Sequence, residues 1–393
     1  MIARIAALFV LLLGAPFGAQ AQITSLAPPD TVDALAFGEA IAMDGNRAIV
    51  GAPEEKVCGP DSGAAYVYER DPEWGTWEAV ARITPDPCRE NAFFGNAVAL
   101  HGDRALISAS AEFFATPEPD AAFVFERRGT DWEQTAALTG ENDVQEGAFA
   151  ADVALTERHA VVSTRGDYQG TFGGAVYVFT YDAETEGWNR EARLTSERPV
   201  ERGILGGTLS AYGNRIAVSA PMYFADALGE VHIFEREEST GDWITATVLP
   251  DMDDFSVPVS LHGSHILVGE RRAGSNRSGH ATLYKQTDGG AWNKLQTLTP
   301  RVPYEDGAFG SAVAVHDDWA LITGYDEQLQ QDVNIDRVVY VFRRAENDTW
   351  QQHTIIDVGR LDFGTDLALD QGIALVSWVP PQGEGKVYAI TLQ

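Results

Sequence analysis

The residues best suited to recognition are aromatic and arginine side chains in segments of variable length between recurring hydrophobic phrases. Planar rings with a few charged neighbours can stack on a glycan or anchor a peptide, because a few large side chains often carry most of the binding energy. We therefore predict a ligand-binding set that consists of Phe113, Phe114, Tyr168, Tyr223, Phe224, Arg271, Arg272, Tyr325 and Trp378. The open alternative is that these side chains fold down and pack over the neighbouring strands.

Sequence motifs for catalysis are missing. There is no nucleophile elbow, His-Glu-x-x-His helix, phosphate-binding loop or metal-spaced Cys/His cluster. We therefore predict no catalytic residue and no metal ligand, and favour a binding protein over an enzyme. His101, His262 and His316 occupy equivalent turns of the recurring phrase, which indicates a shared turn position. The alternative function is a hydrolase or lyase that acts on polysaccharide with acid and base carboxylates drawn from several repeats.

Carboxylates also recur just before the phrases. Glu146, Asp254, Asp306 and Asp362 lie one to three residues ahead of the first hydrophobic residue of their phrase. They could form a ring that attracts cations, or they could accept backbone N–H bonds that fix the entry into each phrase. We favour the structural interpretation.

The recurring phrase predicts a β-hairpin. In FGNAVALHGDRALISA, which begins at Phe94, two runs rich in aliphatic residues flank a turn that contains Gly102, and glycine accepts the positive φ of a tight turn. The seven copies begin at Phe37, Phe94, Phe149, Leu205, Phe255, Phe309 and Phe363. Such a repeat indicates one array rather than two unrelated domains.

Each repeat continues with two more predicted strands. The third alternates aromatic and aliphatic residues, as in GAAYVY at 63–68, and the fourth opens with a tryptophan that we expect to pack between neighbouring sheets. These tryptophans are Trp77, Trp132, Trp188, Trp243, Trp292 and Trp350. The seventh repeat ends without a fourth strand, whereas Leu26-Ala27-Pro28 matches one in its offset from Phe37. We predict an all-β, seven-bladed propeller of four-stranded antiparallel blades in which the N-terminal strand closes the seventh blade.

Phe37-Gly38 with Gly51-Ala52-Pro53, and more weakly Phe94-Gly95 with Ser108-Ala109-Ser110, resemble the FG-GAP repeat. That family includes the N-terminal propeller of integrin α subunits and many secreted bacterial proteins. The resemblance implies an adhesion or interaction platform without chemistry. It would also allow calcium, but the Asp-x-Asp-x-Asp-Gly loop of integrin-type repeats is missing here, so no cofactor is predicted.

The chain begins with the pattern of an export signal. Arg4 precedes an apolar run over 5–13, and Ala19-Gln20-Ala21 is a small-x-small cleavage site, so we predict a signal peptide over 1–21 and the propeller over 22–393. The apolar run is too short to span a bilayer. We expect a monomer that is secreted to the extracellular space or the periplasm.

Amino-acid composition restricts the classes of binding partner that we expect. A formal charge of −30 at pH 7 argues against nucleic acid and anionic lipid, which leaves an extracellular protein or a glycan. Cys58 and Cys88 are the two cysteines, and an even count behind an export signal predicts a disulfide between them.

Overall fold

The computed structural model describes residues 23–29, 34–111, 120–140, 148–165, 173–197, 205–221, 228–252, 254, 257–274, 276–326, 337–360, 362–381 and 383–393. These residues form strands and connecting segments, and among them no helix is long and apolar enough to cross a membrane. The predicted signal peptide lies outside the described residues.

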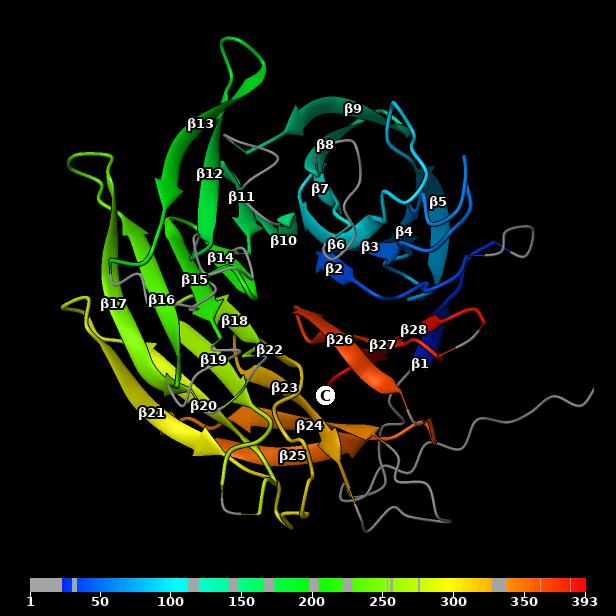
Figure 1. Ribbon diagram of the computed structural model, residues 1–393. Coiled ribbons are helices and arrows are strands. Elements are labelled where there is room, and N and C mark those ends of the chain that lie inside the picture. The colour runs from blue at the N-terminus through cyan, green and yellow to red at the C-terminus, as the bar shows by residue number, and fades with distance from the viewer. Residues whose placement is uncertain are drawn as a thin grey trace, which may run out of the picture.

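Seven four-stranded antiparallel sheets are arranged radially around a central axis, as Figure 1 shows. This arrangement confirms the predicted seven-bladed β-propeller. The innermost strands are β2 (Ile41–Asp44), β6 (Phe94–His101), β10 (Phe149–Leu155), β14 (Leu209–Tyr212), β18 (Val259–His262), β22 (Val313–His316) and β26 (Phe363–Asp370). The second strands are β3 (Arg47–Ala52), β7 (Arg104–Ala109), β11 (His159–Thr164), β15 (Arg215–Ala220), β19 (His265–Glu270), β23 (Trp319–Tyr325) and β27 (Ile373–Trp378).

Along each third strand, successive buried side chains point alternately towards the two adjacent blades. They are β4 (Ala64–Arg70), β8 (Ala121–Arg128), β12 (Ala175–Asp182), β16 (Gly229–Arg236), β20 (His280–Gln286), β24 (Arg337–Arg344) and β28 (Lys386–Thr391). The outer strands are β5 (Trp77–Ile83), β9 (Asp131–Leu138), β13 (Gly187–Leu194), β17 (Trp243–Met252), β21 (Trp292–Leu298), β25 (Trp350–Ile356) and β1 (Ile23–Leu26). Apolar side chains on both faces of the inner strands give a separate core between each pair of blades.

The first hydrophobic residue of the phrase belongs to these cores. Phe37 is 0% exposed, and its ring meets Tyr66 edge to face with 5.7 Å between the centroids. Equivalent edge-to-face pairs are Phe94 with Phe123, Phe149 with Tyr177, Phe309 with Tyr340, and Phe363 with Tyr388. This geometry adds a favourable ring interaction to the burial of a large apolar surface, which explains why the phrase repeats an aromatic residue.

Glycine is required where one blade touches the next. A Cβ added to Gly63 would lie 2.1 Å from the carbonyl oxygen of Phe94, and one added to Gly385 would lie 1.9 Å from that of Phe37. Both positions precede or begin a third strand, and both face the leading phenylalanine of the following blade. Any side chain there would push the blades apart.

The seventh blade combines the two ends of the chain. Strand β1 pairs antiparallel with β28, with Ile23 opposite Ile390 and Leu26 opposite Val387. Leu26 is 1% exposed in the core between the seventh and first blades, and Tyr68 donates a 2.7 Å hydrogen bond to the carbonyl oxygen of Ala27. The predicted closure by the N-terminal strand is confirmed.

The fourth-strand tryptophans pack between blades, as predicted. The Trp243 ring lies 5.3 Å from the His159 ring of the preceding blade, and Trp350 lies 6.0 Å from His265 of its preceding blade. Trp188 makes the equivalent contact with the Arg104 guanidinium at 5.7 Å. These rings therefore stabilise the blade interfaces rather than forming a ligand platform.

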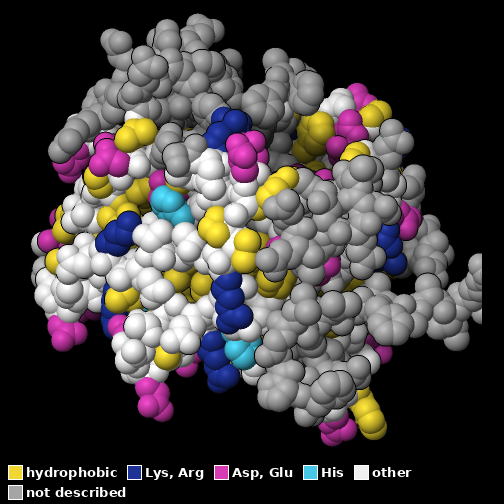
Figure 2. Space-filling view, turned by 90° about the horizontal axis from the view of Figure 1, so that it is seen from below, with side chains coloured by type: hydrophobic (Ala, Val, Ile, Leu, Met, Phe, Trp, Pro, Cys, Tyr) yellow, Lys and Arg dark blue, Asp and Glu magenta, His cyan; other side chains and the backbone are white. Residues whose placement is uncertain are grey.

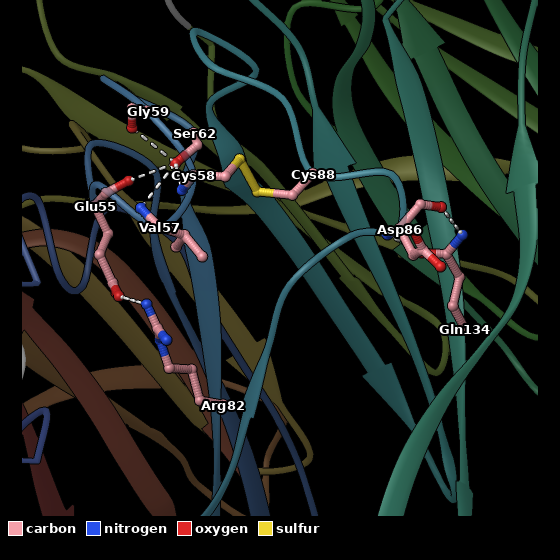
Figure 3. The surroundings of a disulfide bond; sticks show 9 residues. All are labelled: Glu55, Val57, Cys58, Gly59, Ser62, Arg82, Asp86, Cys88 and Gln134. Carbon is pink, nitrogen blue, oxygen red and sulfur yellow. Dashed lines mark hydrogen bonds and ion pairs between the residues drawn. A yellow bond between two sulfur atoms is a disulfide. The ribbon is translucent and has the colours of Figure 1, made fainter.

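A disulfide joins Cys58 and Cys88, as predicted, with 6.3 Å between the Cα atoms (Figure 3). Cys58 lies in the segment between β3 and β4, and Cys88 lies in the link from β5 to β6. The same link is held to the second blade, where the Gln134 amide exchanges two 2.9 Å hydrogen bonds with the backbone of Asp86. The bridge thus fastens the first blade to the connection that enters the second.

Candidate functional site

The seven inner strands surround a central channel with a volume of about 840 Å³. Neighbouring inner strands lie in parallel register: the Ile41 N–H donates to Asp366 Oδ2 at 2.8 Å, and the Gly45 N–H donates to Asp370 Oδ2 at 2.6 Å. Every inner strand therefore begins at one mouth of the channel and ends at the other. The two mouths carry different residues.

Connections of different length define the two faces. We call the side that carries the tight turns between first and second strands, such as 45–46 and 263–264, the hairpin face. The opposite side is the loop face. It carries the connections between second and third strands, such as 53–63 in the first blade and 379–385 in the seventh. Figure 2 shows acidic, basic and hydrophobic side chains interspersed over the described surface on one side of the molecule. Surface charge alone therefore does not mark a binding site on this side of the molecule.

Arg337 lies on the loop-face side and reaches a residue of the channel wall. It is the first residue of β24, it is half-buried, and its Nη2 donates a 3.0 Å hydrogen bond to Ser311 Oγ on the channel wall. Its guanidinium carbon lies 5.9 Å from the centre of the Tyr325 ring. Burial lowers the pKa of Arg337, and electrostatic interactions with the Tyr325 and Asp362 side chains partly offset this decrease. Arg337 is thus a partly desolvated cation beside an aromatic ring, an arrangement suited to recognition.

The two predicted arginines, Arg271 and Arg272, lie in the preceding blade and already have partners. Arg271 Nε contacts Asp254 Oδ1 at 3.3 Å, and the backbone N–H of Arg272 donates to Asp254 Oδ2 at 3.2 Å. The Asp254 side chain is 0% exposed. Asp306 likewise pairs with Arg277 at 3.2 Å. These contacts support the interpretation that the carboxylates ahead of the phrases fix loops.

The predicted aromatic residues are only partly described. Tyr325 and Trp378 are half-buried at the ends of β23 and β27, and Trp378 packs on the core beside the seventh blade. The Arg360 guanidinium carbon lies 4.7 Å from the centre of the Trp378 ring. Phe113, Phe114, Tyr168, Tyr223 and Phe224 lie outside the described residues. A ligand-binding role for the set stays a prediction.

Carboxylates also face the channel near the loop-face mouth. Asp366 is half-buried and lines the channel. The pKa of Asp366 is raised to about 7, chiefly by desolvation and to a smaller extent by the charges of Asp152 and Glu39, although N–H bonds from Ile41 and Leu367 act to lower it. Desolvation wins. The equivalent Asp152 accepts N–H bonds from Leu209 and Val153 at 2.8 Å, so both aspartates join neighbouring blades.

The raised pKa of Asp366 predicts a pH dependence of stability. Because the folded-state pKa of about 7 exceeds the ordinary value of 3.8, protonation favours the folded state, and this stabilisation is lost as the pH rises through the folded-state pKa. Relative to Asp366→Asn, which cannot ionise, the wild type should lose about 1.4 kcal/mol of stability for each pH unit between about 4 and 7. Urea unfolding of both proteins at pH 5 and pH 8 measures this. A difference that is the same at both pH values would contradict the assignment.

The hairpin-face mouth carries one residue from the end of each inner strand. In chain order these are Asp44, His101, Thr156, Tyr212, His262, His316 and Asp370. Several bond to the next blade: Asp44 Oδ2 accepts the Gly102 N–H at 2.5 Å, as Asp370 does from Gly45. The shared turn position predicted for the histidines is therefore real, and it is also a shared position on the channel rim.

Two of the three histidines come together there. The His262 and His316 rings lie 3.8 Å apart between centroids, His262 Nε2 is 3.1 Å from Asp317 Oδ1, and His316 Nε2 is 2.7 Å from Asp370 Oδ1. Burial and the nearby His316 lower the pKa of His262. Burial alone would raise the pKa of Asp370, but hydrogen bonds from His316 and Gly45 outweigh it and the pKa is lowered. Asp370 is therefore ionised at neutral pH.

The sequence prediction missed this cluster, because it treated each histidine by itself. The signal was present: His262 and His316 hold the same position in consecutive repeats, and Asp317 follows the second directly. In a propeller, equal positions in consecutive repeats are neighbours on a ring. His101 has no histidine in the adjacent repeats at that position, and it lies 3.8 Å from Asp44 instead.

The FG-GAP repeat family matches residues 21–68 and 77–125. No curated protein matches the sequence. Among the solved structures with a similar fold is a Bacteroides uniformis protein provisionally assigned as a 6-phosphogluconolactonase, with a TM-score of 0.53 and 12% identity over 82% of this chain and 85% of that one. At that identity the likeness concerns the fold alone. The chain is thus a seven-bladed β-propeller whose first two repeats match the FG-GAP repeat family.

Proposed function

We propose that the chain is an exported binding protein that recognises a protein or a glycan on its loop face. The propeller fold and the FG-GAP repeats support this role, because a rigid ring of blades presents its longest connections together on one side. The disulfide fits an extracellular setting. The side chains of the site indicate the chemistry of the ligand.

The proposal depends on the buried charge of Arg337. Among the described residues it forms no ion pair with a carboxylate, and Asp362 acts on its charge from beyond ion-pair distance. Burial without a paired carboxylate leaves a cation that an anionic group can satisfy. Tyr325 supplies an aromatic face beside that charge. A glycan with carboxylate or sulfate groups matches both features, as an acidic peptide segment also would.

The test is a binding screen followed by a charge deletion. We expect the mature protein to bind one or more acidic polysaccharides or acidic secreted proteins, and Arg337→Gln to raise the Kd at least about tenfold, or about 1.4 kcal/mol. Arg343→Gln is the matched control, because Arg343 lies on the same strand beside Trp319, towards the hairpin face. Equal affinities of wild type and Arg337→Gln for every ligand found would rule out this site.

Asp366 favours a second candidate function, a polysaccharide-active hydrolase or lyase. A carboxyl group with a pKa of about 7 inside a channel is suited to general acid catalysis. Against this role, both of its oxygens already accept backbone N–H bonds, from Ile41 and from Leu367. Each ligand found in the screen should therefore be incubated with the protein and assayed for new reducing ends and unsaturated products. Cleavage that Asp366→Asn abolishes would establish the enzyme.

A further inference from the structure

The histidine cluster on the hairpin face brings three possible ligands together from two adjacent blades. His262 ends β18, His316 ends β22, and Asp317 occupies the turn that follows β22. One donor atom from each side chain lies within 4.8 Å of the others. The histidines are half-buried, with side chains 20% and 17% exposed, whereas the Asp317 side chain is 68% exposed. The cluster therefore has one side open to solvent.

Hydrogen bonding fixes the tautomer that we infer for His316. Its Nε2 lies 2.7 Å from Asp370 Oδ1, and the other oxygen of Asp370 accepts the Gly45 N–H at 2.6 Å. Since a carboxylate only accepts, Nε2 carries the proton and donates it to Asp370. In a neutral ring, Nδ1 then keeps a lone pair. Asp370 and Gly45 thus hold the ring in one orientation.

The remaining nitrogen of His316 faces another acceptor. Nδ1 is buried, makes no hydrogen bond within the described part of the chain, and lies 3.4 Å from Asp317 Oδ2. A lone pair that faces a carboxylate oxygen is unfavourable unless a cation lies between them. Asp317 also lies 3.1 Å from His262 Nε2 through its other oxygen. The carboxylate therefore stands between two imidazole nitrogens.

These separations fit a metal ion. Zinc bonds to histidine nitrogen and carboxylate oxygen are about 2.0–2.2 Å long, so two ligands of a tetrahedral ion are separated by about 3.3 Å. Asp317 Oδ1 lies 3.1 Å from His262 Nε2, and the other oxygen, Oδ2, lies 3.4 Å from His316 Nδ1, each close to that value. Tyr212 packs against His262 with 4.7 Å between ring centroids, which steadies the second ligand. We propose that His262, His316 and Asp317 bind a divalent transition metal ion such as Zn²⁺, with Asp370 as the positioning residue of His316.

The donor set also predicts selectivity. Imidazole nitrogen suits Zn²⁺, Cu²⁺, Ni²⁺ and Fe²⁺, whereas Ca²⁺ and Mg²⁺ require about six oxygen ligands. Asp317 is the one member of the cluster that offers oxygen. The site therefore differs in chemistry from a calcium loop. Three protein ligands leave the fourth position for water or for a group of a bound partner.

The test is a titration of the mature, untagged protein with ZnCl₂ after treatment with a chelator. We expect one Zn²⁺ per chain by calorimetry, and Co²⁺ in its place should give the visible absorption of a tetrahedral N/O site. Asp317→Asn and His316→Gln should each lose at least tenfold in affinity. Asp370→Asn should weaken binding about 10- to 100-fold while the metal-bound spectrum persists. His101→Gln changes the same rim position in another blade and should bind as the wild type does.

Absence of zinc uptake, displacement of zinc by equimolar Ca²⁺, or unchanged affinity in both Asp317→Asn and His316→Gln would show that a proton, not a metal, lies between His316 and Asp317. Because the Asp317 side chain is 68% exposed, Asp317→Asn should melt as the wild type does without metal. That variant keeps the test valid even if a histidine substitution disturbs folding.

Discussion

Deletion of residues 23–28 from the mature chain is expected to reduce stability by at least about 3 kcal/mol and to cause association between molecules. The deletion removes Leu26 from a core in which it is 1% exposed, and loss of a buried leucine side chain alone costs about 2–5 kcal/mol. It also leaves β28 as an unpaired edge, which can pair with another chain. Thermal melting and light scattering after size exclusion measure the two effects.

Two point variants separate the contributions to this closure. Leu26→Ala removes apolar packing but keeps the strand pairing, so it should be destabilised without association. Ser25→Ala changes an exposed side chain of the same strand and should melt as the wild type does. If the deletion variant stayed monomeric with an unchanged melting temperature, pairing of β1 with β28 would not be what holds the ring closed.

The second large effect is expected from the disulfide. Replacement of both Cys58 and Cys88 by serine should lower the free energy of unfolding by about 3.6 kcal/mol, because the bridge spans 30 residues and restricts the unfolded chain. Guanidinium unfolding of the two proteins at equal pH provides the measurement. The wild type treated with a reductant should match the double variant. Two reactive thiols in exported wild-type protein would show that the bridge does not form.

The fold could be predicted because the repeat encodes contacts that recur around the ring. Phe37 and its equivalents repeat because each must fill the same core between blades, and Gly63 or Gly385 repeats because a backbone carbonyl lies where a side chain would be. The offset of Ala27 from Phe37 was enough to predict the closing strand. These features depend on period and residue size, which a sequence displays directly.

The site was harder to predict, because it depends on where the symmetry is broken. Arg337 was not in the predicted set, since it opens a third strand and not a variable loop in the repeat pattern. Its importance comes from its burial beside Ser311 and Tyr325, which only the packed structure reveals. The proton arrangement at His316 depends on Asp370, which is 54 residues later in the seventh blade, and on Gly45, which lies near the start of the chain in the first blade. No local pattern links those residues.

The pairing of β1 with β28 also constrains the order in which the protein can fold. Ile23 finds its partner Ile390 only after nearly the whole chain has been synthesised, and contacts of such long sequence separation are slow to form. Until then Ile23 to Leu26 form an unpaired segment. The blades between can assemble one upon another in sequence, since each contacts mainly its neighbours. We therefore expect ring closure to be the last step of folding, and the chain to be most exposed to aggregation before it.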